Sequence, residues 1–137
     1  MRKFQAPIAA AIVALIVAAG ATAAAYTVTI NVKGGTGSHT LKACGAVHHY
    51  TVYRVGSTIK IDGAVSPAPA AFHVKLKVKQ CIRGTFKTIW TGAAQESAGG
   101  TFSGVYAARR RGAFFARAYV HVGTQIFKTN KEHFQVR

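Results

Sequence analysis

The stretch FHVKLKVKQC, residues 72–81, alternates hydrophobic with basic or polar residues until it reaches a cysteine. A period of two is typical of a β-strand with one buried and one exposed side, because successive side chains point to opposite faces. The apolar positions, which we expect to face a core, are Val74, Leu76 and Val78. Lys75, Lys77 and Lys79 then share the other face, where they form either a binding surface or simply the solvated side of the strand.

The same period recurs along the rest of the chain. Further strands are predicted at about residues 26–32, 50–55, 58–65, 86–91, 101–108, 113–122 and 125–136. Turn sequences rich in Gly, Pro or Ser separate them, among them GGTGS (34–38), SPAPA (66–70) and ESAGG (96–100). No segment has helical periodicity. Seven or eight short strands with turns at roughly ten-residue intervals predict an all-β fold of two packed antiparallel sheets.

Several short motifs carry a family resemblance: YRVGSTIKIDGAVSPA, VKLKV, FKTIW, GGTFSG and FFARAYV, spread over about residues 50–122. Together they resemble the immunoglobulin-like β-sandwich domains of secreted bacterial proteins. In that family a glycine ends an early strand (here Gly63), a Gly-x-Phe strand follows a turn (here Gly100 to Phe102), and an Arg-Ala pair lies in a late strand (here Arg117-Ala118). The resemblance implies an immunoglobulin-like antiparallel sandwich but no particular activity, since this fold serves many functions.

The first 25 residues have the plan of a secretory signal peptide. A basic pair, RK, precedes an apolar run over about residues 8–19, and small residues follow. We expect cleavage after Ala23 or Ala25, with Ala25 favoured. The alternative is an uncleaved membrane anchor, but the apolar run is shorter than the roughly 20 residues that span a bilayer. Residues 26–137 would then be a single domain without a transmembrane anchor, secreted or loosely associated with the envelope.

Cys44 and Cys81 are the two cysteines of the chain. In an exported protein such a pair predicts one disulfide, worth about 3 to 4 kcal/mol in the chain-entropy model. Two free thiols, or a metal site that combines the thiolates with histidines, are the alternatives. The late strand near Tyr119 lacks the second cysteine of antibody-type domains, so we expect the bridge to join the N-terminal loop to the end of the 72–81 strand.

The charge is strongly one-sided. Of the eighteen Lys and Arg residues two lie in the predicted signal peptide, so the processed chain carries sixteen against three acids, about +13 net. Such an excess favours contact with envelope polymers, nucleic acid, anionic lipid or an acidic protein surface. The candidate polyanion-binding residues are Lys75, Lys77, Lys79, Arg109, Arg110 and Arg111. Two alternatives remain: lysines on an outer strand protect a sheet edge from aggregation, and a charge run in a turn is commonly just solvated.

The sequence gives little support for catalysis. The six histidines are His39, His48, His49, His73, His121 and His133, and the acids that could orient them are only Asp62, Glu96 and Glu132. A nuclease site of two histidines and a lysine, or a copper or zinc site, would need a motif that the sequence lacks. We therefore expect no catalytic residues, no metal ligands and no cofactor.

Aromatic residues could let a basic face stack nucleic-acid bases. Tyr53, Phe115 and Tyr119 are candidates, although we expect most of them to be core residues. The sequence thus predicts a secreted, strongly basic, non-catalytic binding or structural module that contacts polyanions or an acidic partner, without sequence-specific reading of nucleic acid. The alternatives are a small secreted inhibitor or cationic antibacterial protein, and a small nuclease or metal-binding protein.

Overall fold

The computed structural model describes residues 25–137, which form strands, turns and loops. The strands are β1 (Thr27–Lys33), β2 (Gly37–Ala43), β3 (Ala46–Tyr53), β4 (Thr58–Ser66), β5 (His73–Ile82), β6 (Thr85–Ala93), β7 (Gln95–Glu96), β8 (Thr101–Ala107), β9 (Gly112–Val122), β10 (Gln125–Lys128) and β11 (Glu132–Val136). The predicted signal peptide lies outside the described residues except for Ala25. Within residues 25–137 no helix is long and apolar enough to cross a membrane.

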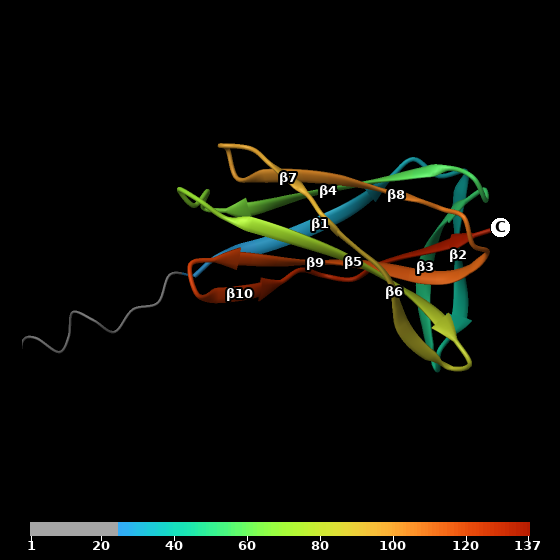
Figure 1. The fold of residues 1–137 in the computed structure, drawn as a ribbon. Coiled ribbons are helices and arrows are strands. Elements are labelled where there is room, and N and C mark those ends of the chain that lie inside the picture. The colour runs from blue at the N-terminus through green and yellow to red at the C-terminus, as the bar shows by residue number, and fades with distance from the viewer. Residues whose placement is uncertain (1–24) are drawn as a thin grey trace, which may run out of the picture.

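The strands form two sheets that pack face to face (Figure 1). The small sheet has the order β1-β4-β8-β7. The large sheet has the order β2-β3-β11-β9-β5-β6, and β10 pairs with β9 beyond the end of β11. The prediction of an all-β fold with two packed sheets is therefore confirmed.

The strand count and the pairing differ from the expectation. Eleven strands cover the described residues instead of seven or eight. The added ones are β2, which was not predicted, the two-residue β7, which overlaps the start of an expected turn, and the division of residues 125–136 into β10 and β11. In addition, β11 runs parallel to β3, so the large sheet is not wholly antiparallel. These two strands are far apart in the chain, and no hairpin forces them to be antiparallel.

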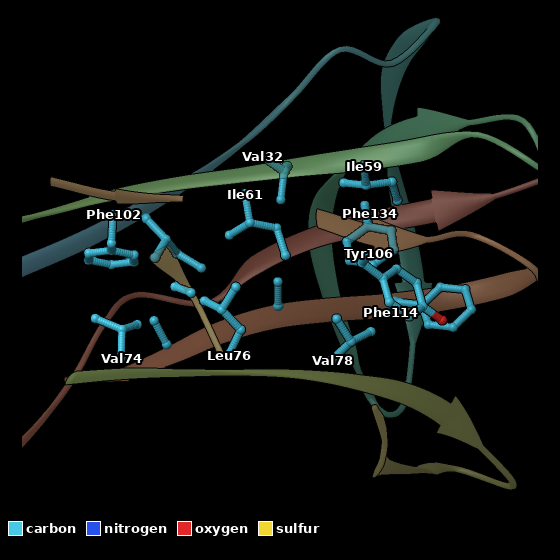
Figure 2. Close-up of a cluster of buried hydrophobic side chains, with 14 of the residues drawn as sticks. Val32, Ile59, Ile61, Val74, Leu76, Val78, Phe102, Tyr106, Phe114 and Phe134 are labelled. Carbon is cyan, nitrogen blue, oxygen red and sulfur yellow. The ribbon is translucent and has the colours of Figure 1, made fainter. Parts of the chain in front are cut away.

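The core lies between the two sheets, and the alternation of the 72–81 stretch places its apolar side there (Figure 2). Val74, Leu76 and Val78 are 4%, 1% and 0% exposed. They face residues of the small sheet that are as deeply buried, including Ile61 and Phe102. Gly63 lies inside β4 rather than at its end. A glycine is needed there because the ring of Phe102 occupies the space of a side chain.

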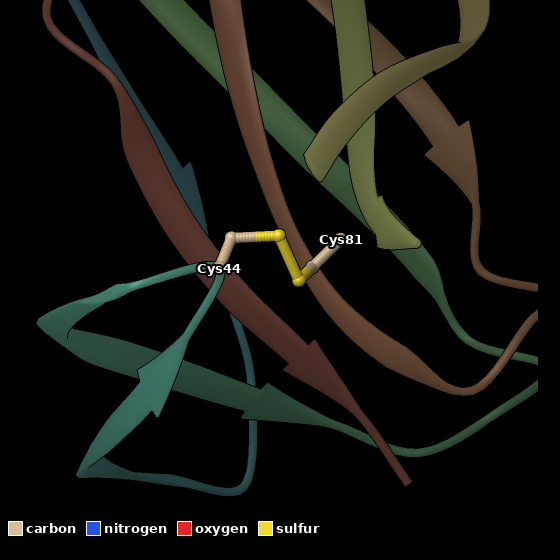
Figure 3. Close-up of a disulfide and its surroundings, with 2 residues drawn as sticks. All are labelled: Cys44 and Cys81. Carbon is tan, nitrogen blue, oxygen red and sulfur yellow. A yellow bond between two sulfur atoms is a disulfide. The ribbon is translucent and has the colours of Figure 1, made fainter. Parts of the chain in front are cut away.

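A disulfide joins Cys44, in the turn between β2 and β3, to Cys81 near the end of β5 (Figure 3). This confirms the predicted pairing. Three strand spacings separate β3 from β5 in the large sheet, about 14 Å if the sheet were flat. The Cα atoms of the two cysteines are only 5.8 Å apart. The large sheet must therefore curl, so that its outer face, the one turned away from the small sheet, is concave at the bridged end.

Removal of this bridge should destabilise the fold without changing its core. For the variant Cys44→Ala/Cys81→Ala we expect the free energy of unfolding to fall by about 3 kcal/mol, because the 37-residue separation is no longer closed in the unfolded chain. Urea denaturation followed by tryptophan fluorescence measures the change. Treatment with dithiothreitol should lower the stability of the wild type to that of the variant. Equal stability of the oxidised wild type and the variant would contradict this account of the bridge.

Candidate functional site

The lysine row lies in the interior of the large sheet. β5 pairs with β9 on one side and with β6 on the other, so Lys75, Lys77 and Lys79 do not lie on an edge strand. Protection of a sheet edge is therefore the wrong explanation for them. Lys75 is exposed, whereas Lys77 and Lys79 are half-buried, and all three project from the outer face.

Each lysine of the row faces a residue on β9. Lys75 lies opposite Tyr119, Lys77 opposite Arg117, and Lys79 opposite Phe115. The pair of Lys77 and Arg117 places two positive charges directly across two interior strands, an arrangement that destabilises a sheet. Sheet stability alone would favour an uncharged or acidic partner at this position.

The loop between β10 and β11 holds Arg117 in place. Its guanidinium Nε donates a hydrogen bond of 2.8 Å to the carbonyl oxygen of Thr129. Thr129 is itself buried and fixed to β9, because its hydroxyl accepts a 2.9 Å hydrogen bond from the backbone N–H of Ala118. The bond through Nε leaves the two terminal nitrogens of Arg117 for a ligand. A cation held this way loses less conformational entropy on binding than a free one.

More cations complete what we call the basic face, the outer surface of β5, β9 and β10. Lys128 on β10 lies opposite Tyr119, and the Lys131 ammonium lies over the Phe115 ring at 5.0 Å from its centroid. The members of the basic face are Lys75, Lys77, Lys79, Arg117, Lys128 and Lys131. The sequence analysis identified the first three and missed the others, since only the pairing of β9 with β5 and β10 brings them together.

Two of the three aromatic candidates for base stacking are buried. Tyr53 is 3% exposed, and its hydroxyl donates a 2.8 Å hydrogen bond to the carbonyl oxygen of Lys33. Phe115 is 4% exposed. Tyr119 alone of the three is half-buried on the basic face, with the Lys77 ammonium 4.8 Å from its ring centroid. One aromatic ring is thus available within a group of cations.

On the concave part of the outer face, where the large sheet curls, five aromatic rings pack together. We call this group the outer aromatic cluster, and it consists of His48, Tyr50, Phe86, Phe115 and His133. His48 and His133 stack with ring centroids 3.9 Å apart. Burial, together with the nearby His48 and Lys131, lowers the pKa of His133 to about 4. The cluster closes the bridged end of the outer face and leaves the end with Lys75 and Tyr119 open.

Arg109, Arg110 and Arg111 lie between β8 and β9, in what we call the arginine turn. Arg109 and Arg110 line a pocket of about 340 Å³ together with Trp90 and Tyr106. Trp90 lies opposite Val78, so it belongs to the core-facing side of the large sheet, whereas the lysines project from the other side. The structure therefore does not place the arginine turn on the basic face.

Two histidines meet at the open end of the basic face. His73 lies directly opposite His121 across β5 and β9, and both line a groove of about 600 Å³ that Lys75 and Thr91 also border. His48 and His49 point to opposite faces, as expected: His48 joins the outer aromatic cluster and His49 is exposed. Within residues 25–137 no three His, Cys, Asp or Glu residues come close enough together to hold a metal ion.

The burial of His133 makes the stability of the protein dependent on pH. The unfolded chain binds a proton at this ring near pH 6.5, the folded chain near pH 4. Stability should thus be fully present above about pH 7, fall as the pH drops through 6.5, and level off near pH 4. We expect the free energy of unfolding to fall by about 2 kcal/mol over this range. This is less than the full pKa shift of His133 implies, because water reaches part of the ring and weakens the effect.

The variant His133→Phe keeps an aromatic ring in the cluster and removes the titrating group. Its free energy of unfolding, measured by urea denaturation from pH 7.5 to pH 4, should fall less steeply than that of the wild type. His49→Gln, at an exposed position on the same sheet, is the matched control and should retain the wild-type slope. Identical slopes for wild type and His133→Phe would show that this histidine is not the titrating group.

Neither a protein-family model nor a curated protein matches this chain. Any inference about its function therefore depends on the residues of the chain itself. They supply a concentration of positive charge on interior strands, one half-exposed tyrosine within it, and a groove lined by two histidines where the row of lysines ends.

Proposed function

We propose that this chain is an exported, non-catalytic binding module that holds polyanions on the basic face. Its ligands would be anionic envelope polymers, extracellular nucleic acid or an acidic protein surface. It would need no cofactor, and it would read charge and spacing rather than base sequence. The immunoglobulin-like family and the cleaved signal peptide are part of this proposal. A Cys44–Cys81 disulfide is compatible with an oxidising, extracellular location.

The observation that carries the proposal is the facing pair of Lys77 and Arg117. Like charges opposite each other on neighbouring strands cost stability, and in the described part of the chain no carboxylate pairs with Lys77 or Arg117. Of the three acids, Asp62 forms an ion pair with Lys33 on the small sheet, and Glu132 lies opposite Ala116 on the core-facing side. Glu96 contacts His73 at the far end of the row. An anion from outside would relieve the repulsion.

The mechanism we infer is charge neutralisation with release of counterions. The lysines follow one another at ~6.6 to 6.8 Å along β5, which is close to the repeat of anionic groups on an extended polymer. Arg117 adds a fixed cation beside this row, and Tyr119 offers a ring edge or face to any flat group of the ligand. Affinity should therefore depend steeply on salt and little on sequence.

A comparison of two triple variants tests whether the basic face, rather than the net charge, does the binding. Lys75→Gln/Lys77→Gln/Lys79→Gln and Arg109→Gln/Arg110→Gln/Arg111→Gln each remove three charges, from different sides of the molecule. We expect the lysine variant to weaken binding to a single-stranded oligonucleotide at least tenfold at 50 mM NaCl. Its plot of log affinity against log salt should be shallower than that of the wild type by about 2.

The arginine variant is the matched control, and its affinity should stay within about threefold of the wild type. Equal losses in the two variants would show that binding follows net charge and has no location. Elution of the wild type from heparin at or below physiological salt would count against polyanion binding altogether. Thermal unfolding of both variants checks that the fold is intact, and the lysine variant should be slightly more stable because its row no longer repels Arg117.

A further inference from the structure

The groove at the open end of the basic face has a different lining from the lysine row. It begins where β5 begins, between the ends of β6 and β9, and holds about 600 Å³. Its polar lining consists of His73, Lys75, Thr91 and His121. These side chains come from three adjacent strands and together supply an ammonium, a hydroxyl and two imidazoles. All four groups can donate hydrogen bonds toward a ligand in the groove.

His73 and His121 form a directly opposed cross-strand pair on the outer face. In such a pair the Cβ atoms lie ~4.5 to 5.5 Å apart, so both rings reach a single small group between or above them. On the side of His121 away from His73, the opposing residue on β10 is the uncharged Ile126. The two imidazoles thus border the groove without an acidic residue on either β9 or β10 to occupy them.

Of the acids within residues 25–137, only Glu96 on β7 contacts this pair. Its carboxylate oxygen lies 3.8 Å from Nδ1 of His73. This contact leaves Nε2, on the opposite side of the ring, for a ligand. The other charged groups near the histidines are Lys75 on β5 and Lys128, two residues along β10 from Ile126, while β6 contributes the neutral Thr91 and Ala93.

The side chain of His73 is 89% exposed, so the groove binds a group at its surface and does not enclose it. This favours binding over acid–base catalysis, which gains most where water is excluded. A carboxylate offers two oxygens in one plane. A phosphomonoester offers three oxygens in three directions and a charge of about −1.5 to −2 at neutral pH, which matches several donors that come from three strands.

We propose that this groove is a subsite for a terminal phosphomonoester, the phosphorylated end of a polymer whose backbone lies along the lysine row. The proposal rests on the function proposed above and deepens it. His73 and His121 hold two of the phosphate oxygens, Lys75 supplies the fixed charge, and Thr91 donates to the third oxygen.

The test compares a twelve-residue oligothymidylate that bears a phosphate at its 5′ end, at its 3′ end, or at neither end. Fluorescence anisotropy with the processed protein, residues 26–137, should show about tenfold tighter binding of one phosphorylated form than of the unphosphorylated strand. The variant His73→Gln/His121→Gln should lose this preference and keep the affinity for the unphosphorylated strand within about twofold. His39→Gln/His49→Gln, which alters two histidines on β2 and β3, is the matched control and should retain the preference.

Equal affinity of the wild type for all three oligonucleotides would overturn the subsite while leaving the proposed function intact. If no oligonucleotide binds, the proposed function fails and the subsite is tested alone with phenyl phosphate. Saturable shifts of the His73 and His121 ring resonances in NMR spectra, absent with benzoate and absent at His49, would support it. No shift at millimolar phenyl phosphate, or equal shifts with benzoate, would refute it.

Discussion

The contact between Cys44 and Cys81 limits how far the large sheet can open. Strands that a flat sheet would hold about 14 Å apart are brought within bonding distance, and the outer face curls around the gap. The outer aromatic cluster fills the inside of this curl. On the outer face of β9, Phe115 is therefore buried near the bridged end, whereas Tyr119 is half-exposed toward the open end. The curl thus determines which part of the basic face stays open to a ligand.

Most cations of the basic face lie on interior strands, where repulsion between like charges destabilises a sheet most. Cations on interior strands have neighbours on both sides, so their repulsion cannot be relaxed as it can at an edge. Lys77 and Lys79 lie over the rings of Tyr119 and Phe115, which recovers part of this cost through cation–π attraction. The deeper part of the same sheet behaves in the opposite way, because His133 is kept neutral by burial and by its charged neighbours. The large sheet thus combines an open surface, on which cations repel one another, with a partly buried region in which His133 stays neutral.

Alternation alone predicted the strands with one buried side, and it identified the core residues of β5 and the direction of its lysines. It missed β2, because that strand pairs only with β3 and Leu41 is its one large apolar residue. It also missed the break at Thr129, since the role of that residue is a set of contacts with Ala118 and Arg117 that no local pattern reveals. The disulfide followed from the number of cysteines and the predicted compartment. The site residues Arg117, Lys128, His73 and His121 could not be grouped in advance, because strand order brings them together and the sequence does not encode strand order locally.

The position of β11 has a consequence for assembly. It comes last among the strands and yet lies between β3 and β9, with a parallel neighbour on one side and an antiparallel one on the other. Until residues 132–136 are inserted, no strand pairing links the β2–β3 hairpin to β9, and the Cys44–Cys81 bridge is the one connection across this gap in the large sheet. The large sheet becomes continuous only when residues 132–136 are in place, so its completion depends on a segment that follows every other described strand in the chain.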